Sequence, residues 1–567
     1  MNDRTTPDTA RSAADLDLLI GSAAALSEAG QHEAAVAEYR RALVLAPDNG
    51  GVLLNLGVLL GWLGRGDEAL LCLERATQLI PQVAQAWYNL GNLQYRRGNL
   101  AEAEAALWRA LSLAGGNQDA GLVSAMIGAQ ELTLQGQGDV ARVSAFLREA
   151  AGHFPAHEDE CMRLGLLSLS MDASVDGATL LARHLEWAGR FADPQTRAAA
   201  SHNIDRSRRR LRIGYVSADL REHAVARFLE PVLRHHDIDR FEVWCFDNGR
   251  DTDTTTTLLK SHVDHWQSIG SLDDAAACAL VRALGIDILI DLSGHTAGNR
   301  LGLFARRPAP LQVAYLGYSA TTGMLAMDYR ISDSIVDPPP QADARYRERL
   351  LRVEPVQWCY QPPPEARATA VRALLHTPIR FGVFNRFDKV GDAALALWGR
   401  ILARTPGSVL FMRGVPEGSA RQTLAQRLEH AGCDPARVIP TGRIAASAYW
   451  RSYHEADIAL DTFPYNGATT TCESLWMGIP VITLPGAAGA ARYGATLLSA
   501  TGMKEFVAGD EESYVDLAAN LAADPTRLAG LRASLRERVA TSALMDAVGF
   551  TRKLEAAYLE AWQSVVN

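Results

Sequence analysis

Several features that would point to other classes of protein are missing from this chain of 567 residues. Its seven cysteines are scattered and none forms a C-x2-C pair, which argues against a disulfide framework or structural zinc and fits a reducing compartment. The formal net charge is −9, so nucleic acid is not expected as the main partner. No run of about 18 uninterrupted apolar residues occurs, and the polar N-terminus lacks an apolar signal-peptide core. We therefore expect a cytoplasmic protein without a membrane span.

Short motifs of the common nucleotide enzymes and metalloenzymes are missing as well. There is no G-x-G-x-x-G after the first predicted strand of either α/β half of the chain, no G-x4-G-K-[ST] and no H-E-x-x-H. This disfavours a dinucleotide dehydrogenase, a P-loop kinase and a zinc hydrolase. The run Asp251-Thr252-Asp253 matches the D-x-D of metal-dependent sugar transferases, but it lies in a polar, threonine-rich loop and is more simply explained as a solvated turn. We expect neither a metal ion nor a cofactor.

The first part of the chain does have a regular internal repeat. The residues that recur at one constant spacing are small or apolar: Gly30, Gly64 and Gly98; Ala35, Ala69 and Ala103; Ala42, Ala76 and Ala110; Leu45, Leu79 and Leu113. This spacing, about 34 residues, is typical of tetratricopeptide repeats, in which each repeat is a pair of antiparallel helices. We expect repeats over 15–116, a disordered tail over 1–14, and degenerate repeats or capping helices over 117–205, because a solenoid needs atypical ends.

From about residue 206 onward, strand and helix patterns alternate. The β-rich runs LRIGYVS, FEVWCF, IDILIDL and LQVAYLG form a first series, and IRFGVFN, SVLFMRG, RVIPTG, DIALDT and IPVITL form a second one after a proline cluster. This predicts two doubly wound, Rossmann-like lobes over 206–376 and 377–545, with a ligand cleft at the carboxyl ends of their strands. The segment 546–567 is predicted to be a helix that crosses back to the first lobe. Arginines in SHNIDRSRRRLR fit a solvated linker or an ion-pair patch better than a nucleic-acid site.

The strongest candidate for phosphate binding is DTFPYNGATTTCESLWMG. Here a glycine-containing turn leads from a strand into a helix that opens at Thr469, Thr470 and Thr471, where backbone N–H groups, hydroxyls and the helix dipole favour an anion. Glu473 cannot comfortably face the same phosphate and is better placed to accept hydrogen bonds from ribose hydroxyls. The alternative is that the threonines are N-caps and Glu473 is a capping partner.

Further candidates follow the strands that line the predicted cleft. Lys389 lies just past IRFGVFN, from where its ammonium could reach a diphosphate, and Asn385 and Arg386 share its loop. His223 follows LRIGYVS and His295 follows IDILIDL, which places both at the cleft rim, where imidazole can exchange a proton near neutral pH. A surface lysine and structural histidines are the alternatives.

In the repeats, Asn55 and Asn89 recur at the repeat spacing and each precedes a Leu-Gly pair. We expect both to face the inner side of the first helix of successive repeats. Their side-chain amides could bind the backbone of an extended peptide, or they could form hydrogen bonds between helices.

Together, four motifs resemble the O-GlcNAc transferase family: GYVSADLREH, DLSGHTAGNRLGLFARRPAPLQVAYLGYSATTG, FNRFDK and LDTFPYNGATTTCESLWMGIPVIT. The resemblance covers nearly the whole chain, and the short repeat array is similar to that of a bacterial member. It implies an α solenoid followed by a two-lobed α/β glycosyltransferase of the GT-B type. The implied reaction is metal-independent, inverting transfer of GlcNAc from UDP-GlcNAc to serine or threonine of proteins bound by the repeats.

The resemblance also implies residue roles: His223 in the active centre as a proposed general base, Lys389 on the donor diphosphate, Thr469 and Thr470 on the same diphosphate, Glu473 on the ribose, Gly317 and Tyr318 beside the sugar, and Asn55 and Asn89 on the acceptor peptide. Three positions depart from the animal members: Ala468 and Tyr449 stand in place of histidines, and Arg386 in place of a glutamine. A related transferase with another donor sugar or an asparagine acceptor therefore stays open. So does a catalytically silent repeat scaffold, although Lys389, His223 and the TTT-x-E pattern speak against it.

Overall fold

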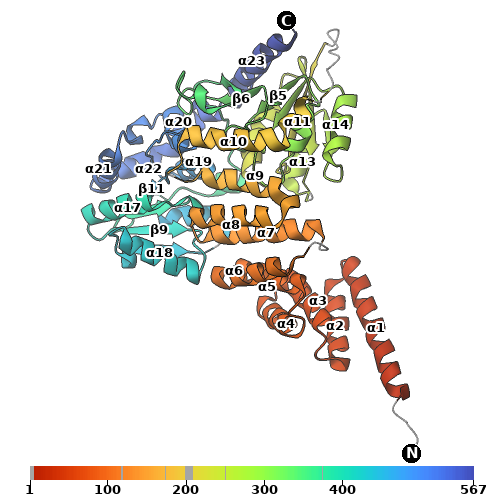
Figure 1. Cartoon of the computed structure of the whole chain (residues 1–567). Helices are drawn as coiled ribbons and strands as arrows, with labels where there is room; N and C mark the ends of the chain where they lie inside the picture. Colours follow the sequence, from red (N-terminus) through yellow and green to blue (C-terminus); the bar gives the residue numbers. More distant parts are fainter. Residues whose placement is uncertain are drawn as a thin grey trace, which may run out of the picture. The chain divides into compact units, whose positions relative to one another are not determined.

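The computed structural model describes residues 6–115, 119–172, 174–197, 199, 209–249, 251–372, 374–442 and 444–566. The chain divides into two compact units. The first consists of Met1–Phe146 with Pro416–Thr423, and the second of Leu147–Val415 with Leu424–Asn567. Figure 1 gives the labels of the helices and strands.

The first unit is built from antiparallel helices. Their bounds are α1 Thr6–Glu28, α2 His32–Leu45, α3 Gly50–Trp62, α4 Gly66–Leu79, α5 Ala84–Arg97, α6 Leu100–Leu113 and α7 Ala120–Gly136. Because α1 begins at Thr6, the prediction of a disordered tail over 1–14 is wrong from that residue onward; the alanine-rich run TARSAADLDLL is a good helix former. Residues 1–5 lie outside the described residues.

The regular spacing of the repeats has a steric explanation. A Cβ atom on Gly57 of α3 would lie 2.7 Å from Cγ of Leu73 in α4, and a Cβ atom on Gly91 of α5 would lie 2.6 Å from Cγ of Leu107 in α6. Glycine therefore lets the two helices of each repeat approach closely at the same point. Gly30, Gly64 and Gly98, which follow the first helices of the repeats, have φ of +74°, +76° and +82°, a conformation that favours glycine.

The second unit contains two parallel sheets. The first has the order β3-β2-β1-β4-β5-β6-β7 and the second β10-β9-β8-β11-β12. The strands are β1 Leu211–Ser217, β2 Phe241–Asp247, β3 His265–Ser268, β4 Ile288–Asp291, β5 Leu311–Ala314, β6 Tyr329–Ser332, β7 Arg349–Arg352, β8 Arg380–Val383, β9 Val409–Arg413, β10 Val438–Thr441, β11 Ile458–Leu460 and β12 Val481–Ile482. In both sheets the strand order reverses beside the first strand. The carboxyl ends of β1 and β4, and of β8 and β11, therefore flank the switch point at which doubly wound sheets bind ligands.

Helices connect these strands and complete the unit. Those that lie wholly within it are α9 Glu158–Leu169, α10 Gly177–Phe191, α11 Asp193–Arg197, α12 Ala224–His235, α13 Thr254–Lys260, α14 Asp274–Ala283, α15 Leu301–Ala305, α16 Pro364–Ala368, α17 Asp392–Arg404, α19 Thr469–Trp476, α20 Tyr493–Ala500, α21 Glu511–Ala522, α22 Pro525–Ala540 and α23 Ala547–Val566. The sequences of α8 (Val140–His153) and α18 (Ser419–His430) are shared by the two units.

Short 3-10 helices lie in the connections between these helices and strands. They are η1 Pro155–His157, η2 Asp343–Arg345, η3 Phe387–Lys389, η4 Pro435–Arg437, η5 Ala446–Ala448, η6 Trp450–Glu455, η7 Gly489–Arg492, η8 Lys504–Phe506 and η9 Ala543–Met545. Within the described residues, no helix is both long and apolar enough to cross a bilayer.

Two helices distant in sequence complete the core of the first sheet. The α23 helix lies against α12 and β5, and Glu555 accepts hydrogen bonds from the His236 ring (3.0 Å) and the Asp237 amide (2.7 Å). The α10 helix also belongs here, because Trp187 packs in one cluster with Val216 of β1. The α10 helix, which lies in the segment 117–205 predicted as degenerate repeats or capping helices, thus also covers the first sheet with its apolar face.

Candidate active site

Lys389 lies at the switch point of the second sheet. It ends η3, directly after β8, and its Nζ lies 4.2 Å from the centroid of the Tyr465 ring. No ion pair of Lys389 occurs among the described residues. Burial lowers the pKa of the Lys389 ammonium to about 8, while the nearby Asp388 carboxylate opposes this shift. An anion bound beside Lys389 would favour the charged ammonium and raise this pKa.

Asp461, which directly follows β11, organises the loops at this end of the sheet. Its carboxylate accepts hydrogen bonds from the amides of Thr462 (2.9 Å) and Gly467 (2.8 Å), the Thr483 hydroxyl (2.8 Å) and the side-chain amide of Asn385 (3.1 Å). Burial raises the pKa of Asp461 to about 6 against the effect of these bonds. Sequence reasoning missed this residue, although a carboxylate at the end of a buried strand could have signalled it.

Asn385 ties the β8 loop to the start of α19. Its Oδ1 accepts a hydrogen bond from the Thr470 hydroxyl, and its Nδ2 donates to Thr462 Oγ1 at 2.5 Å. The predicted substrate-binding amide is thus used internally and orders the loop. Arg386, the other predicted residue of this loop, is exposed and pairs with Asp388 at 2.5 Å.

The start of α19 presents unpaired backbone donors. The first amide to make a helical bond is that of Cys472, which donates to the Ala468 carbonyl at 3.1 Å, so the three preceding amides are the free donors found at every helix start. The Thr469 hydroxyl has no partner among the described residues. Thr471 is buried and its hydroxyl donates to the Gly467 carbonyl at 2.9 Å, so its predicted contact with substrate would have to use the backbone amide.

Glu473 is completely buried and its carboxylate is already occupied. It accepts hydrogen bonds from the hydroxyls of Tyr449 (2.7 Å) and Tyr453 (2.6 Å), and it forms an ion pair with Arg227 of α12 in the first lobe. In this structure the Glu473 carboxylate is thus engaged by protein groups, and its contact with ribose hydroxyls stays a prediction. Its first-turn position put it near the cleft, but the side chain turns into the interface between the lobes.

Tyr449 and Tyr453 extend this polar network to β9. Arg413, at the end of that strand, donates to both tyrosine hydroxyls, at 3.1 and 3.0 Å, and its guanidinium lies 4.4 and 4.6 Å from the centroids of their rings. Tyr449, which stands where animal relatives are expected to have a histidine, therefore acts here as a link between a buried arginine and a buried glutamate.

His223 lies at the switch point of the first sheet. It is the N-cap residue of α12, with Nδ1 3.3 Å from the Val225 amide and 3.6 Å from the Asp219 carboxylate, and its side chain is 42 % exposed. Burial lowers the pKa of His223, and Asp219 partly opposes this. The residue is therefore an accessible imidazole that is mainly neutral at pH 7, as a general base requires.

The ion pair between the lobes sets the position of His223 relative to α19. Arg227 follows His223 by four residues, and Glu473 follows Thr469 by four, which is about one helical turn in each case. The contact between Arg227 and Glu473 therefore brings the first turns of α12 and α19 together. His223 and the open amides of α19 thus belong to the first turns of two helices that this ion pair joins.

His295 is not at the cleft rim as predicted. It is completely buried, its Nε2 lies 2.9 Å from the Thr322 carbonyl, and its ring packs against those of His184, Trp187 and Tyr318. Burial lowers the pKa of His295 well below its ordinary range. It is a neutral core residue, because α10 covers the loop that the sequence left open.

The same cluster fixes Gly317 and Tyr318, the residues expected beside the sugar. The Tyr318 side chain is buried and its hydroxyl lies 2.7 Å from Nε2 of His184. A Cβ atom on Gly317 would lie 2.0 Å from the Leu292 carbonyl oxygen, so only glycine fits there. A ligand beside these two residues would therefore meet their backbone and not the Tyr318 phenol.

The D-x-D run has a structural role at its second aspartate. Asp253 is the N-cap of α13, accepting from the Thr256 amide at 2.8 Å and from the Glu222 amide at 2.7 Å. In the part of the chain that the structure describes, no group of three or more histidine, cysteine or carboxylate side chains could hold a metal ion.

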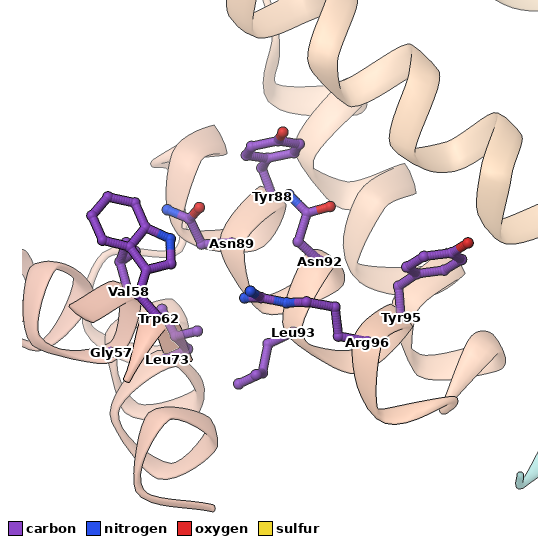
Figure 2. A pocket seen from close by; sticks show the side chains of 10 residues that line it. All are labelled: Gly57, Val58, Trp62, Leu73, Tyr88, Asn89, Asn92, Leu93, Tyr95 and Arg96. Atoms are coloured by element: carbon purple, nitrogen blue, oxygen red, sulfur yellow. The ribbon is translucent and has the colours of Figure 1, made fainter. Parts of the chain in front are cut away.

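The repeat asparagines differ from one another. Asn89 is half-buried and lines a hollow between α3, α4 and α5 (Figure 2), whereas Asn55 is exposed and is hydrogen-bonded to Tyr39. The two side chains therefore do not have the same environment, although their spacing is that of the repeat.

Comparison with known proteins gives relatives for both parts of the chain. A tetratricopeptide-repeat model matches residues 84–117. A protein of Petunia hybrida named probable UDP-N-acetylglucosamine–peptide N-acetylglucosaminyltransferase SPINDLY is 39% identical over 388 residues, covering 67% of this chain and 42% of that protein. The UDP-N-acetylglucosamine–peptide N-acetylglucosaminyltransferase of Caenorhabditis elegans is 25% identical over 476 residues, 62% of this chain and 41% of its own length. The chain thus spans less than half the length of these relatives.

A solved structure matches the chain from end to end. It is a lysine-to-methionine mutant of the O-GlcNAc transferase of Thermobaculum terrenum, with 34% identity, a TM-score of 0.74, and coverage of 100% of this chain and 99% of that one. The two sheets are thus the lobes of a GT-B fold. The model of glycosyl transferase family 41 matches residues 195–356 and 367–554, which together make up more than half of the chain. This protein belongs to glycosyl transferase family 41.

Proposed function

We propose that this protein transfers GlcNAc from UDP-GlcNAc to serine or threonine hydroxyls of proteins held by its repeats. The observation that carries the proposal is the juxtaposition of Lys389 and the open amides of α19 at one switch point with His223 at the other. Membership of the family and the printed names of the relatives support the choice of donor and acceptor.

In the proposed reaction, the acceptor oxygen attacks the anomeric carbon of GlcNAc with inversion. A bond forms between these two atoms as the bond from the anomeric carbon to the diphosphate oxygen breaks, and the hydroxyl proton passes to His223. UDP leaves with the bonding electrons. Lys389 and the amides of Thr469–Thr471 stabilise its growing negative charge, which is electrostatic stabilisation of a leaving group.

We further propose that no metal ion takes part, because a cation and a helix start already face the expected position of the diphosphate. Turnover in the presence of EDTA should equal turnover without it. Inhibition by EDTA that manganese reversed would contradict this and would make the loop of Asp251 and Asp253 a candidate metal site.

The donor sugar is the part of the proposal that most needs a direct test. In this structure the Glu473 carboxylate has Arg227 and two tyrosine hydroxyls as partners, so its expected contact with the ribose stays a prediction and another nucleotide sugar stays open as the donor. Purified protein should be incubated with UDP-GlcNAc, UDP-glucose and GDP-linked sugars in turn, with nucleotide release and the mass of a protein acceptor both followed. Preference for UDP-GlcNAc with a GlcNAc mass shift is expected. Another donor would correct the sugar, and no turnover with any donor would favour a silent scaffold.

A further inference from the structure

The hollow in the repeats has a distinctive chemistry (Figure 2). It has a volume of about 350 Å³ and is lined by Gly57, Val58, Trp62, Leu73, Tyr88, Asn89, Asn92, Leu93, Tyr95 and Arg96. Three of these side chains are aromatic, two are amides and one is a guanidinium, but none is a carboxylate. Trp62 is 63% exposed, which is a large apolar surface for a side chain that usually packs in a core or an interface.

Arg96 is an exposed side chain of α5 that brings a positive charge to this hollow. Figure 2 shows its guanidinium extending from α5 towards the side where Trp62 and Asn89 lie. No ion pair of Arg96 occurs among the described residues. The next residue, Arg97, differs from it in pairing with Asp67 at 2.9 Å.

The other carboxylate at the start of α4 is also engaged. Glu68 pairs with Arg65 at 2.7 Å and with Arg40 at 2.5 Å. Arg96 is therefore a cation beside an exposed aromatic ring, and the carboxylates of the first turn of α4 are held by other arginines. A ligand that supplies an anion would complete this arrangement.

We propose that this hollow binds an extended segment of a partner protein that carries an aspartate or glutamate beside an apolar side chain. The carboxylate pairs with Arg96, and the apolar side chain lies on the Trp62 ring. The amides of Asn89 and Asn92 offer both donors and acceptors to the peptide backbone. This inference rests on the proposed function and deepens it, because it states which segments the repeats select.

The test uses full-length protein and fluorescent peptides, without any sugar donor. Three peptides share one leucine-containing sequence and differ at one position, which is Asp, Asn or Lys. The wild type should bind the Asp peptide about fivefold or more tightly than the Asn peptide, with a preference that shrinks as salt is raised. Arg96→Ala should abolish this preference, and Arg96→Glu should favour the Lys peptide.

Arg97→Ala is the matched control, since it removes an adjacent arginine that is already paired. Arg97→Ala should keep the preference for the Asp peptide. Trp62→Ala should weaken the binding of all three peptides by a similar factor. Circular dichroism melts check that each variant is folded. If Arg96→Ala does not fold, Arg96→Gln is used in its place.

Four outcomes would overturn the proposal: a preference that survives loss of Arg96, an equal loss in Arg97→Ala, no binding of any peptide, or a dimer of this chain that Arg96→Glu dissociates. Hydrolysis of the sugar donor by the same preparations is measured separately. Activity there with no peptide preference would overturn the docking proposal alone.

Discussion

At the scale of single residues, Lys389 is the group on which the proposed chemistry depends most. We predict that Lys389→Ala slows transfer roughly 30- to 1000-fold, because the lost contact with a diphosphate is a charge-assisted hydrogen bond of about 2–4 kcal/mol in the transition state. Lys504→Ala, which removes an exposed lysine of the same lobe, is the control. Initial rates with saturating acceptor measure the effect. Activity within about threefold of wild type would remove Lys389 from the site.

The same lysine also predicts a dependence of stability on pH. Burial lowers the pKa of Lys389 to about 8 in the folded protein, below its unfolded value, so the charged form carries a cost that is fully present below pH 8 and fades as pH rises towards the unfolded pKa. Lys389→Met should therefore raise the melting temperature at pH 7, and the gain should shrink in alkaline buffer. An equal gain at every pH would show that burial of the charge is not its cause.

We predict that protonation of His223 sets the acid limb of the pH profile of turnover. Because burial lowers the pKa of its imidazole, the rate should fall only when pH drops below the ordinary histidine range, and deprotonation of Lys389 should lower it again above about pH 8. His223→Ala should lose roughly 100-fold in turnover and with it the acid limb. Affinity for UDP should change little. A parallel loss of UDP affinity would make His223 a binding residue.

At the scale of helices, the glycines of the repeat predict a contrast in stability. In Gly91→Ala the new Cβ would lie 2.6 Å from Leu107 Cγ and 3.3 Å from the Ala103 carbonyl oxygen, so we expect a loss of about 1–3 kcal/mol from overpacking. Gly128→Ala in α7 meets nothing within 4 Å and should gain up to about 1 kcal/mol from helix propensity. Thermal melts of both variants test this. Equal shifts would show that the close approach of α5 and α6 is not what fixes the period.

At the scale of the whole catalytic unit, the contact between Arg227 and Glu473 joins the two lobes. Arg227→Met leaves the buried Glu473 carboxylate with only tyrosine hydroxyls, so we expect a loss of about 2–4 kcal/mol. Adding Glu473→Gln should restore part of it, since the unpaired charge is then absent. Urea unfolding midpoints measure both.

Arg404→Met is the control for this cycle, because Arg404 makes only exposed ion pairs and its loss should cost about 1 kcal/mol or less. Additive effects of Arg227→Met and Glu473→Gln would show that the two side chains do not stabilise each other.

Local patterns in the sequence are sufficient to predict much of the fold of this protein and the positions of two candidate site residues. The regular spacing of small residues predicts the helix pairs, because Gly57 and Gly91 meet the same leucine contact in successive repeats. The alternation of strands and helices predicts two doubly wound sheets, and the position of a residue after a strand places Lys389 and His223 at the switch points. These features depend on residues that are neighbours in sequence or on the order of the strands, and both can be read from the sequence alone.

Tertiary structure decided which of the candidate side chains are buried and which stay accessible. Glu473 and Thr471 lie at the start of the predicted helix, but helix rotation and the approach of Arg227 turn them inward. His295 follows a strand as predicted, yet α10 covers it. Asp461 orders the loops around it because the ends of three strands meet at its carboxylate. Sequence determines the order of elements, whereas burial and the direction of each side chain depend on contacts between segments that folding brings together, such as that of Arg227 with Glu473, 246 residues away.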